Sequence, residues 1–220
     1  MNRVLITFME ISVSPGSIEL QNFNAKRVII CWRDLKLKTK STCYIGRDKI
    51  ILRDVNGTLK TGTMTALMGP SGAGKSSLLK ALMSLNKNMI TKESKFYVNR
   101  DIPIRSAFIA QDVRQHLIPG LTVEQSLYYA SKVKNCSVET EVDHKSVVET
   151  MISEFSMYDI RHTSVEKCSS GEQKKCVLAL ELCAIEKPNL LCVDEPTSCM
   201  DSLSGQMVCS FTECSSHHKK

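Results

Sequence analysis

Long apolar runs are missing from this chain of 220 residues. No window holds the roughly 18 uninterrupted apolar residues that a spanning helix needs, so we expect no transmembrane domain in the chain as given. The run from Val4 to Met9 is short, Glu10 interrupts it, and no small-residue cleavage site follows cleanly. This start is therefore a poor signal peptide, and the chain as given is expected in the cytosol.

Internal repeats and low-complexity segments are also absent, and aromatic residues make up only 5% of the chain. Hydrophobic residues account for 42% and charged residues for 24%, which argues against a fibre or a disordered chain. The length suits one domain, or two small ones, with a real core. The net charge of +6 comes from basic residues spread without a long run, which favours a solvated surface and no nucleic-acid partner.

The ten cysteines form no C-x-x-C pair. Several lie in apolar runs, where a reduced thiol packs as a small apolar group, so we expect free thiols in a reducing compartment. Cys209, Cys214, His217 and His218 could in principle bind zinc. Their spacing fits no standard zinc finger, and a frayed terminus is the favoured interpretation.

Strand and helix patterns alternate after a weakly patterned leader at residues 1–26. Apolar and β-branched runs predict strands at residues 27–37, 49–52, 63–68 and 190–193, and the end of another at 108–110. Helical spacing and capping patterns predict helices at residues 76–85, from Thr122 onward, at 146–157 and at 170–186. Asn56-Gly57 predicts a turn. The alternation indicates an α/β fold with a mostly parallel central sheet.

The strongest motif is a glycine-rich loop between a predicted strand and a predicted helix, Gly69-Pro70-Ser71-Gly72-Ala73-Gly74-Lys75-Ser76. It fits the phosphate-binding pattern G-x-x-x-x-G-K-S/T in its expected context. Glycines let the backbone curl so that its amides converge on phosphate oxygens, and the following helix offers its positive end. Lys75 is predicted to reach the β- and γ-phosphates, and the Ser76 hydroxyl to ligate Mg²⁺. An ordinary glycine-rich turn is the alternative.

A second motif places two carboxylates at the end of an apolar strand, where Asp194 and Glu195 follow residues 190–193. In open α/β sheets, nucleotides bind at the carboxyl ends of the strands. Asp194 is predicted to hold the Mg²⁺ shell, and Glu195 to polarise the attacking water. Acidic residues are common at protein surfaces, so this motif alone is weak evidence for a nucleotide site. Together with the glycine-rich loop it becomes strong.

A third motif, Cys-Ser-Ser-Gly-Glu-Gln-Lys-Lys at residues 168–175, begins the helix that precedes this strand. It resembles the signature motif of ATP-binding-cassette (ABC) proteins, which contacts the γ-phosphate held by a partner domain. Together with residues 69–77, 121–124 and 194–198, this sequence is similar to the G subfamily of ABC transporters, the White-type half transporters. The resemblance covers roughly residues 28–208.

This resemblance implies a P-loop NTPase fold with a RecA-like core, an antiparallel β subdomain and a helical subdomain at about residues 112–168. The leader would occupy residues 1–26 and the cassette residues 27–220. Gln111 looks like the Q-loop glutamine, and residues 198–201 look like the D-loop.

The resemblance also assigns roles. Lys75, Gln111 and Glu195 would be catalytic, and Ser76, Gln111 and Asp194 would hold Mg²⁺. The residues implied to contact ATP are Gly69, Pro70, Ser71, Gly72, Ala73, Gly74, Lys75, Ser76, Ser77, Ser169, Ser170, Gly171, Glu172, Asp194 and Asp201. No aromatic residue is assigned to the adenine, because core packing is the favoured role for Trp32.

Three features depart from the family pattern. Ser170 stands where the signature usually has a glycine and adds a Cβ near the expected phosphate. Cys199-Met200 replaces the usual Gly-Leu of the D-loop. Only 19 residues (220 − 201) follow Asp201, so we expect the chain to stop before the strand that carries the family's switch histidine. His217 and His218 are then tail residues.

The favoured hypothesis is the ATP-hydrolysing cassette of an ABC transporter, at the cytosolic face of a membrane. Its implied partners are ATP, a second cassette in a homo- or heterodimer, and a membrane domain not encoded in this chain. The alternative is a truncated, non-catalytic module that binds a nucleotide or a partner cassette. A soluble ABC ATPase is disfavoured, because it would carry a second cassette or a long coiled coil and the given sequence shows neither. A small-molecule kinase is disfavoured, because it does not account for the signature helix.

Overall fold

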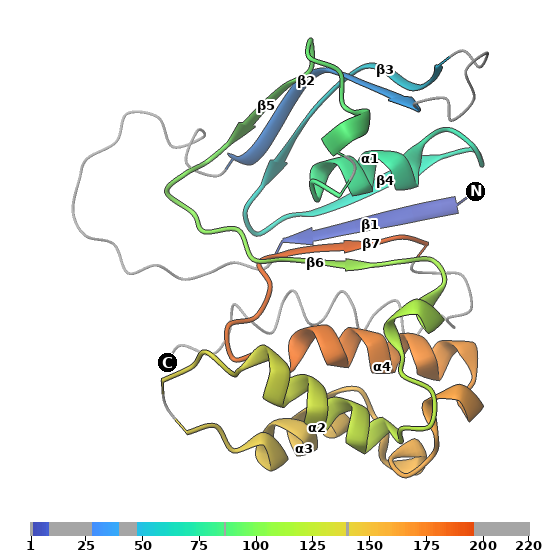
Figure 1. Ribbon diagram of the computed structural model, residues 1–220, viewed down its shortest axis with the longest axis vertical. Helices are drawn as coiled ribbons and strands as arrows, with labels where there is room; N and C mark the ends of the chain where they lie inside the picture. The colour runs from blue at the N-terminus through green and yellow to red at the C-terminus, as the bar shows by residue number, and fades with distance from the viewer. Residues whose placement is uncertain (1, 9–27, 40–47, 86, 140, 196–220) are drawn as a thin grey trace.

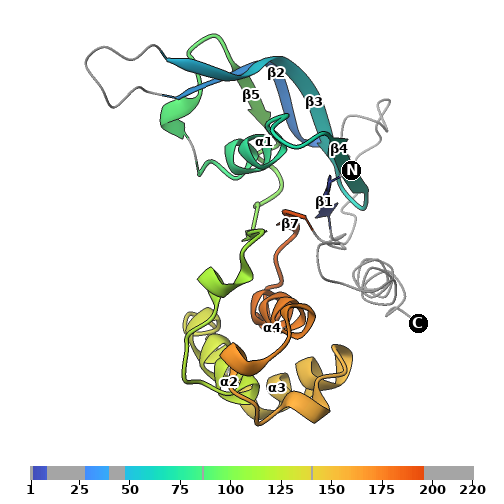
Figure 2. The same ribbon diagram turned by 90° about the vertical axis from the view of Figure 1, so that its right-hand side faces the viewer.

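The computed structural model describes residues 2–8, 28–39, 48–85, 87–139 and 141–195. Figure 1 shows a β-rich part that holds the helix α1 and a helical part that holds α2, α3 and α4, with the strands β1, β6 and β7 between them. Figure 2 shows the same two parts from the side. Among the described helices, none is long and apolar enough to cross a membrane.

The central sheet has the strand order β4-β1-β7-β6. Its strands are β4 (Met64–Gly69), β1 (Asn2–Phe8), β7 (Leu190–Val193) and β6 (Ser106–Ile109). β6 and β7 are parallel, and β1 is antiparallel to both β4 and β7. β4, β7 and β6 therefore run in one direction, which confirms the mostly parallel sheet.

The strand β1 was not expected, because residues 1–26 were interpreted as a leader in front of the fold. Residues 2–8 instead lie in the middle of the central sheet. The residues from Val4 to Phe8 have the side chains that favour strands, but a run so short shows no partner in the sequence. Those partners are β4 and β7, both far along the chain.

A second sheet is antiparallel, with the order β3-β2-β5, and corresponds to the expected β subdomain. It contains β2 (Val28–Thr39), β3 (Lys49–Lys60) and β5 (Lys95–Val98). The predicted turn at Asn56-Gly57 is wrong, because both residues lie inside β3. Gly57 lies against the buried ring of Trp32, where a Cβ would come within 2.2 Å of a ring carbon. The glycine thus serves packing, and Trp32 has the predicted core role.

The helix α1 (Lys75–Leu82) follows β4 and buries Leu78, Leu79 and Leu82 in one core with the antiparallel sheet. A second core joins the helices α2 (Val123–Lys134), α3 (His144–Glu154) and α4 (Ser170–Leu182) to β6 and β7. Short 3₁₀ turns occupy Lys87–Met89 (η2), Val113–His116 (η3), Tyr158–Ile160 (η4) and Val165–Lys167 (η5).

The helix predictions hold with shifted ends. The capping box of Thr122 and Gln125 is confirmed in both directions. α3 begins two residues before the predicted position, because Asp143 accepts hydrogen bonds from the first-turn amides. α4 ends at Leu182, four residues before the predicted end.

Candidate functional site

The glycine-rich loop joins β4 to α1. Gly72 and Gly74 have φ values of +78° and +91°, in the left-handed region that favours glycine. A Cβ on Gly74 would also come within 2.7 Å of a methyl carbon of Leu52. No side chain caps the start of α1, so its first amides remain available to an anion.

Lys75 is folded into this loop. Its Nζ donates to the carbonyl oxygens of Gly69 at 3.0 Å and Pro70 at 2.8 Å. Ser71, Gly72 and Ala73 are exposed at the tip of the loop. The ammonium therefore lies within the curl of the backbone, where it can contact phosphate oxygens bound by the loop amides.

The acidic pair lies at the same edge of the sheet as the loop. In the strand register, Leu5 pairs with Ala66 of β4 on one side and with Val193 of β7 on the other. Because neighbouring strands are about 4.8 Å apart, Ala66 and Val193 are separated by roughly 10 Å. Both strands run in the same direction, so the loop after Gly69 and the acid Asp194 emerge on one side.

Asp194 is buried, with 4% of its surface exposed. Its backbone amide donates to the carbonyl of Ile109, which continues the pairing of β7 with β6. The side-chain atom Oδ1 has no hydrogen-bond partner within the described part of the chain. A buried carboxylate oxygen without a donor is well suited to a cation, so Asp194 fits the predicted role of a Mg²⁺ ligand. Ser76 lies at the start of α1, directly after β4, and the strand β1 lies between β4 and the strand β7 that precedes Asp194.

Gln111 and Glu195 meet although they come from different strands. Gln111 follows β6, and its Nε2 donates to Oε2 of Glu195 at 2.8 Å. Glu195 follows β7 and has a φ of +50°, which is uncommon for a residue with a side chain. Its backbone carbonyl accepts a hydrogen bond from Nζ of Lys174 in α4. Sequence reasoning missed Lys174, whose only signal was its place three and four residues before the apolar Val177 and Leu178.

The signature segment caps α4. The hydroxyl and amide of Ser169 both donate to Oε2 of Glu172 at 2.7 Å, and the Glu172 amide donates back at 3.3 Å. These hydrogen bonds from Ser169 lower the pKa of the Glu172 carboxyl. Ser170 is exposed beside this cap. The pattern S-x-x-E in the sequence could have predicted this capping box.

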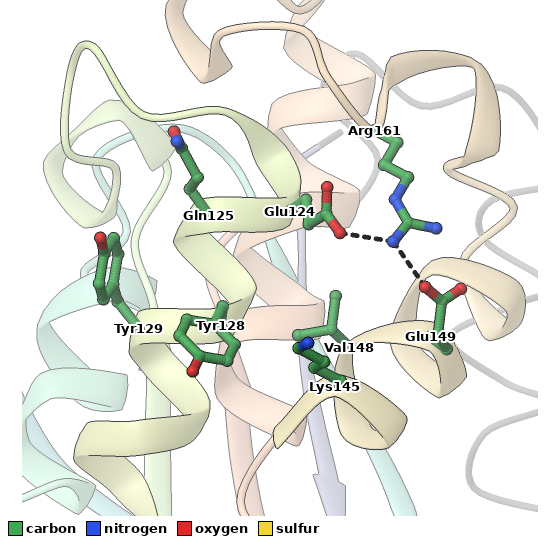
Figure 3. Close-up of a pocket in the computed structure, with 8 residues that line it drawn as sticks. All are labelled: Glu124, Gln125, Tyr128, Tyr129, Lys145, Val148, Glu149 and Arg161. Atoms are coloured by element: carbon green, nitrogen blue, oxygen red, sulfur yellow. Dashed lines mark hydrogen bonds and ion pairs between the residues drawn. The ribbon is translucent and has the colours of Figure 1, made fainter. Parts of the chain in front are cut away.

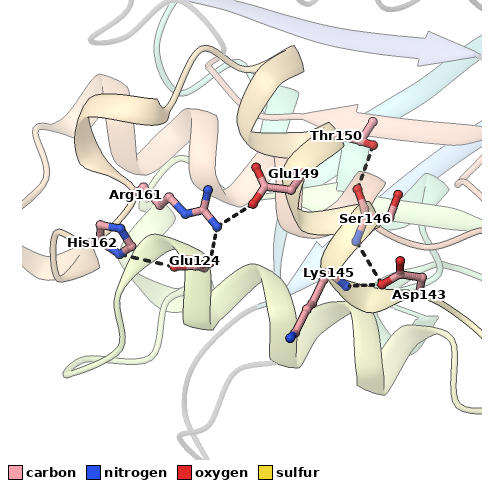
Figure 4. A network of polar contacts seen from close by, with 8 residues as sticks. All are labelled: Glu124, Asp143, Lys145, Ser146, Glu149, Thr150, Arg161 and His162. Carbon is pink, nitrogen blue, oxygen red and sulfur yellow. Dashed lines mark hydrogen bonds and ion pairs between the residues drawn. The ribbon is translucent and has the colours of Figure 1, made fainter.

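Hydrogen bonds also tie the start of α2 to the segment that leads into the signature. The amide of Glu124 donates to the carbonyl of Arg161 at 3.1 Å. The amide of Val165 donates to the carbonyl of Leu121 at 3.0 Å. The Arg161 guanidinium also contacts the carboxylates of Glu124 and Glu149, as Figure 4 shows. The start of α2 and the segment before the signature are thus joined.

A cavity of about 440 Å³ lies between α2 and α3 (Figure 3). None of the residues predicted to hold the nucleotide lines it. The lining residues are Glu124, Gln125, Tyr128, Tyr129, Lys145, Val148, Glu149 and Arg161. This cavity is therefore separate from the candidate phosphate site.

The described cysteines are Cys31, Cys136, Cys168, Cys176, Cys183 and Cys192, and all are free thiols. Burial raises the pKa of Cys176 and of Cys192 to about 12, so both stay protonated at neutral pH. Asp201, the D-loop residues Cys199 and Met200, and the possible zinc group at residues 209–218 lie outside the described residues.

Comparison with known proteins shows the family of the chain. The sequence profile of ABC transporters matches residues 52–198. ABC transporter G family member 11 of Arabidopsis thaliana is 32% identical over 81% of this chain and 26% of the relative. The ABC transporter ATP-binding protein/permease wht-3 of Caenorhabditis elegans is 30% identical over 82% of this chain and 30% of the relative. The chain thus spans less than a third of the length of these relatives.

Solved structures give the fold. A dimeric ATP-binding cassette in a post-hydrolysis state, bound to ADP and Pi, has a TM-score of 0.66 and 20% identity, covering 84% of this chain and 83% of that chain. The structure of cbiO1 from Clostridium perfringens has a TM-score of 0.63 and 17% identity, covering 86% and 74%. The described domain therefore has the P-loop NTPase fold of these cassettes. The chain belongs to the ABC transporter family, and its resemblance to the G-family, White-type members is confirmed.

Proposed function

We propose that this chain binds MgATP and hydrolyses it to power transport by an ABC transporter of the G family. The contact between Gln111 and Glu195 carries the proposal, because it joins two predicted catalytic groups at the edge where the phosphate loop emerges. The similarity to G-family transporters supports the link to transport. The membrane domain of such a transporter would belong to a part of the protein, or to a partner, other than the described residues.

In this proposal, the loop amides and Lys75 bind the β- and γ-phosphates. Ser76 and Asp194 would hold Mg²⁺, with Gln111 as a further ligand. When bound, Mg²⁺ neutralises the charge that develops on the phosphate oxygens during transfer. Glu195 orients and polarises the attacking water, and the Gln111 amide fixes the direction of its carboxylate.

A second cassette completes the site. The signature segment at Ser169, Ser170, Gly171 and Glu172 begins α4 and exposes both serines. In a head-to-tail dimer, this helix start would contact the γ-phosphate of ATP held by the partner. The dimeric cassettes of known structure support such an arrangement. The transporter would hold these cassettes at the cytosolic face of its membrane.

The test compares binding with turnover. Glu195→Gln should bind MgATP with parent affinity in calorimetry while phosphate release falls about 100-fold or more. Lys75→Ala should lose most of the binding. Glu154→Gln, an exposed acid on α3, is the matched control and should resemble the parent. Parent-like turnover in Glu195→Gln would remove this residue from the mechanism and leave the chain as a nucleotide-binding module.

A further inference from the structure

Lys174 is the most deeply buried cation at the site. It lies early in α4, within the signature motif and two residues after Glu172, and only 2% of its surface is exposed. Lysine is almost never fully buried unless it is paired, because removing the ammonium from water is unfavourable. Here Nζ donates to the backbone carbonyl of Glu195. The helix that carries the signature is therefore tied to the residue predicted to activate water.

Glu195 needs such a restraint. Its φ of +50° is a conformation that side-chain-bearing residues adopt only when their surroundings impose it. Two other elements hold it, since Lys174 of α4 binds its carbonyl and Gln111 after β6 binds its carboxylate. The first contact fixes the backbone and the second fixes the side chain. Together they determine where the carboxylate points.

We propose that Lys174 is a positioning residue, which holds the Glu195 backbone so that the carboxylate faces the phosphate site. The proposal rests on the proposed function, in which Glu195 activates water. In the proposed function, Lys174 is not one of the residues that contact the nucleotide. Because α4 begins with the signature, the contact also makes the position of Glu195 depend on the position of that helix. Contact of the signature with a partner's ATP would then reach the water-activating group of this chain.

The first test replaces Lys174 by methionine, which keeps the stem and removes the donor. Lys174→Met should lower kcat about tenfold or more, while the KM for ATP stays within about twofold. Lys174→Arg, which keeps a charged donor, should recover most of the lost turnover. Lys167→Met removes an exposed lysine outside the site and should match the parent. Thermal unfolding of each variant reports the folded fraction, against which kcat is corrected.

The second test asks whether Lys174 acts through Glu195. Single-turnover rates are measured for the parent, both single variants and the double variant Lys174→Met/Glu195→Gln. If the proposal is right, adding Lys174→Met to Glu195→Gln changes the rate less than about twofold, because the positioned group is already gone. If the methionine variant is poorly folded, Lys174→Gln keeps a polar head on a shorter stem and should show the same pattern.

The outcomes separate the two proposals. Parent-like kcat in folded Lys174→Met overturns the role of Lys174 and leaves the proposed function standing if Glu195→Gln is slow. Equal rate losses from Lys174→Met with and without Glu195→Gln also overturn it, because the lysine then acts independently of Glu195. Parent-like hydrolysis in Glu195→Gln overturns the proposed mechanism, and the role of Lys174 falls with it.

Discussion

Gln111 and Glu195 are 84 residues apart in the sequence, yet Nε2 of one donates to Oε2 of the other at 2.8 Å. The contact follows from the parallel pairing of β6 with β7, in which Ile109 lies opposite Val193. Two residues beyond this pair on each strand, the chain reaches Gln111 and Glu195. The sheet register therefore delivers both side chains to one edge.

Removing the amide should affect turnover more than binding. We expect Gln111→Leu to lower kcat about tenfold, because the Glu195 carboxylate loses the donor that fixes its direction. Affinity for ATP should change less, since the proposed function assigns most of the phosphate contacts to the loop amides and Lys75. Gln115→Leu, an exposed amide in η3, is the control. A steady-state phosphate assay decides, and unchanged kcat would contradict the role of Gln111.

The strand β1 separates the phosphate loop strand from the acidic strand, so its backbone should matter for both stability and binding. Leu5→Pro removes an amide donor from a strand paired on both sides. Proline is excluded from such positions, and we expect a loss of roughly 3 kcal/mol in the free energy of unfolding, with weaker MgATP binding. Leu5→Val keeps the amide and should behave as the parent. Chemical denaturation and calorimetry measure the two effects, and a proline variant matching the parent in both would place β1 outside the fold.

Gly57 is predicted to tolerate no side chain. An added Cβ would lie 2.2 Å from a carbon of the Trp32 ring, so Gly57→Ala forces the ring or one of the two strands to move. We expect a loss of about 1–3 kcal/mol in the free energy of unfolding. Trp32→Phe shortens the ring system, so the double variant should lose less than the sum of the single variants. Additive losses would show that the clash is not the cause.

Local patterns were sufficient for several parts of this site. The glycine-rich loop, the apolar strand before Asp194 and the capping box at Thr122 depend on neighbours within a few residues. Gln111 and Glu195 were named by resemblance, and only the register of β6 with β7 shows that they touch. Contacts within one turn or one strand can be predicted from the sequence, because the partners are fixed by the period of the element.

Three of the misses involve distant partners. Residues 2–8 look like an isolated apolar run until β4 and β7 are in place on either side. Asn56-Gly57 is typical of a turn, but the ring of Trp32 from the neighbouring strand selects the glycine instead. Nothing next to Lys174 in the sequence indicates its hydrogen bond, because its partner Glu195 lies 21 residues away. Tertiary packing overrides local preference at each of these positions.

Ser170 offers a test of the signature. It is the first residue of α4 and is exposed where a partner's phosphate would approach. In the proposed dimer, Ser170→Gly should raise ATP turnover severalfold by removing the Cβ, despite a loss of up to about 1 kcal/mol in helix stability. Ser146→Gly, an exposed serine in the first turn of α3, controls for the helix effect. Turnover that falls in Ser170→Gly would show that the hydroxyl contributes to the phosphate contact.

Arg161, Glu124, Glu149 and His162 form a charged cluster, and its contribution to thermal stability should depend on pH. Hydrogen bonding from Arg161 lowers the pKa of the Glu124 carboxyl, and His162 lies 3.3 Å from the same group (Figure 4). A lowered pKa in the folded state stabilises the fold above the unfolded pKa, and this contribution is lost as the pH falls through the folded pKa. Arg161→Met should therefore lower the unfolding temperature by roughly 2–4 °C at pH 7, and by less at about pH 3. Arg100→Met removes an exposed arginine and controls for net charge. An equal shift of the unfolding temperature at both pH values would assign the effect of Arg161→Met to packing of the Arg161 stem.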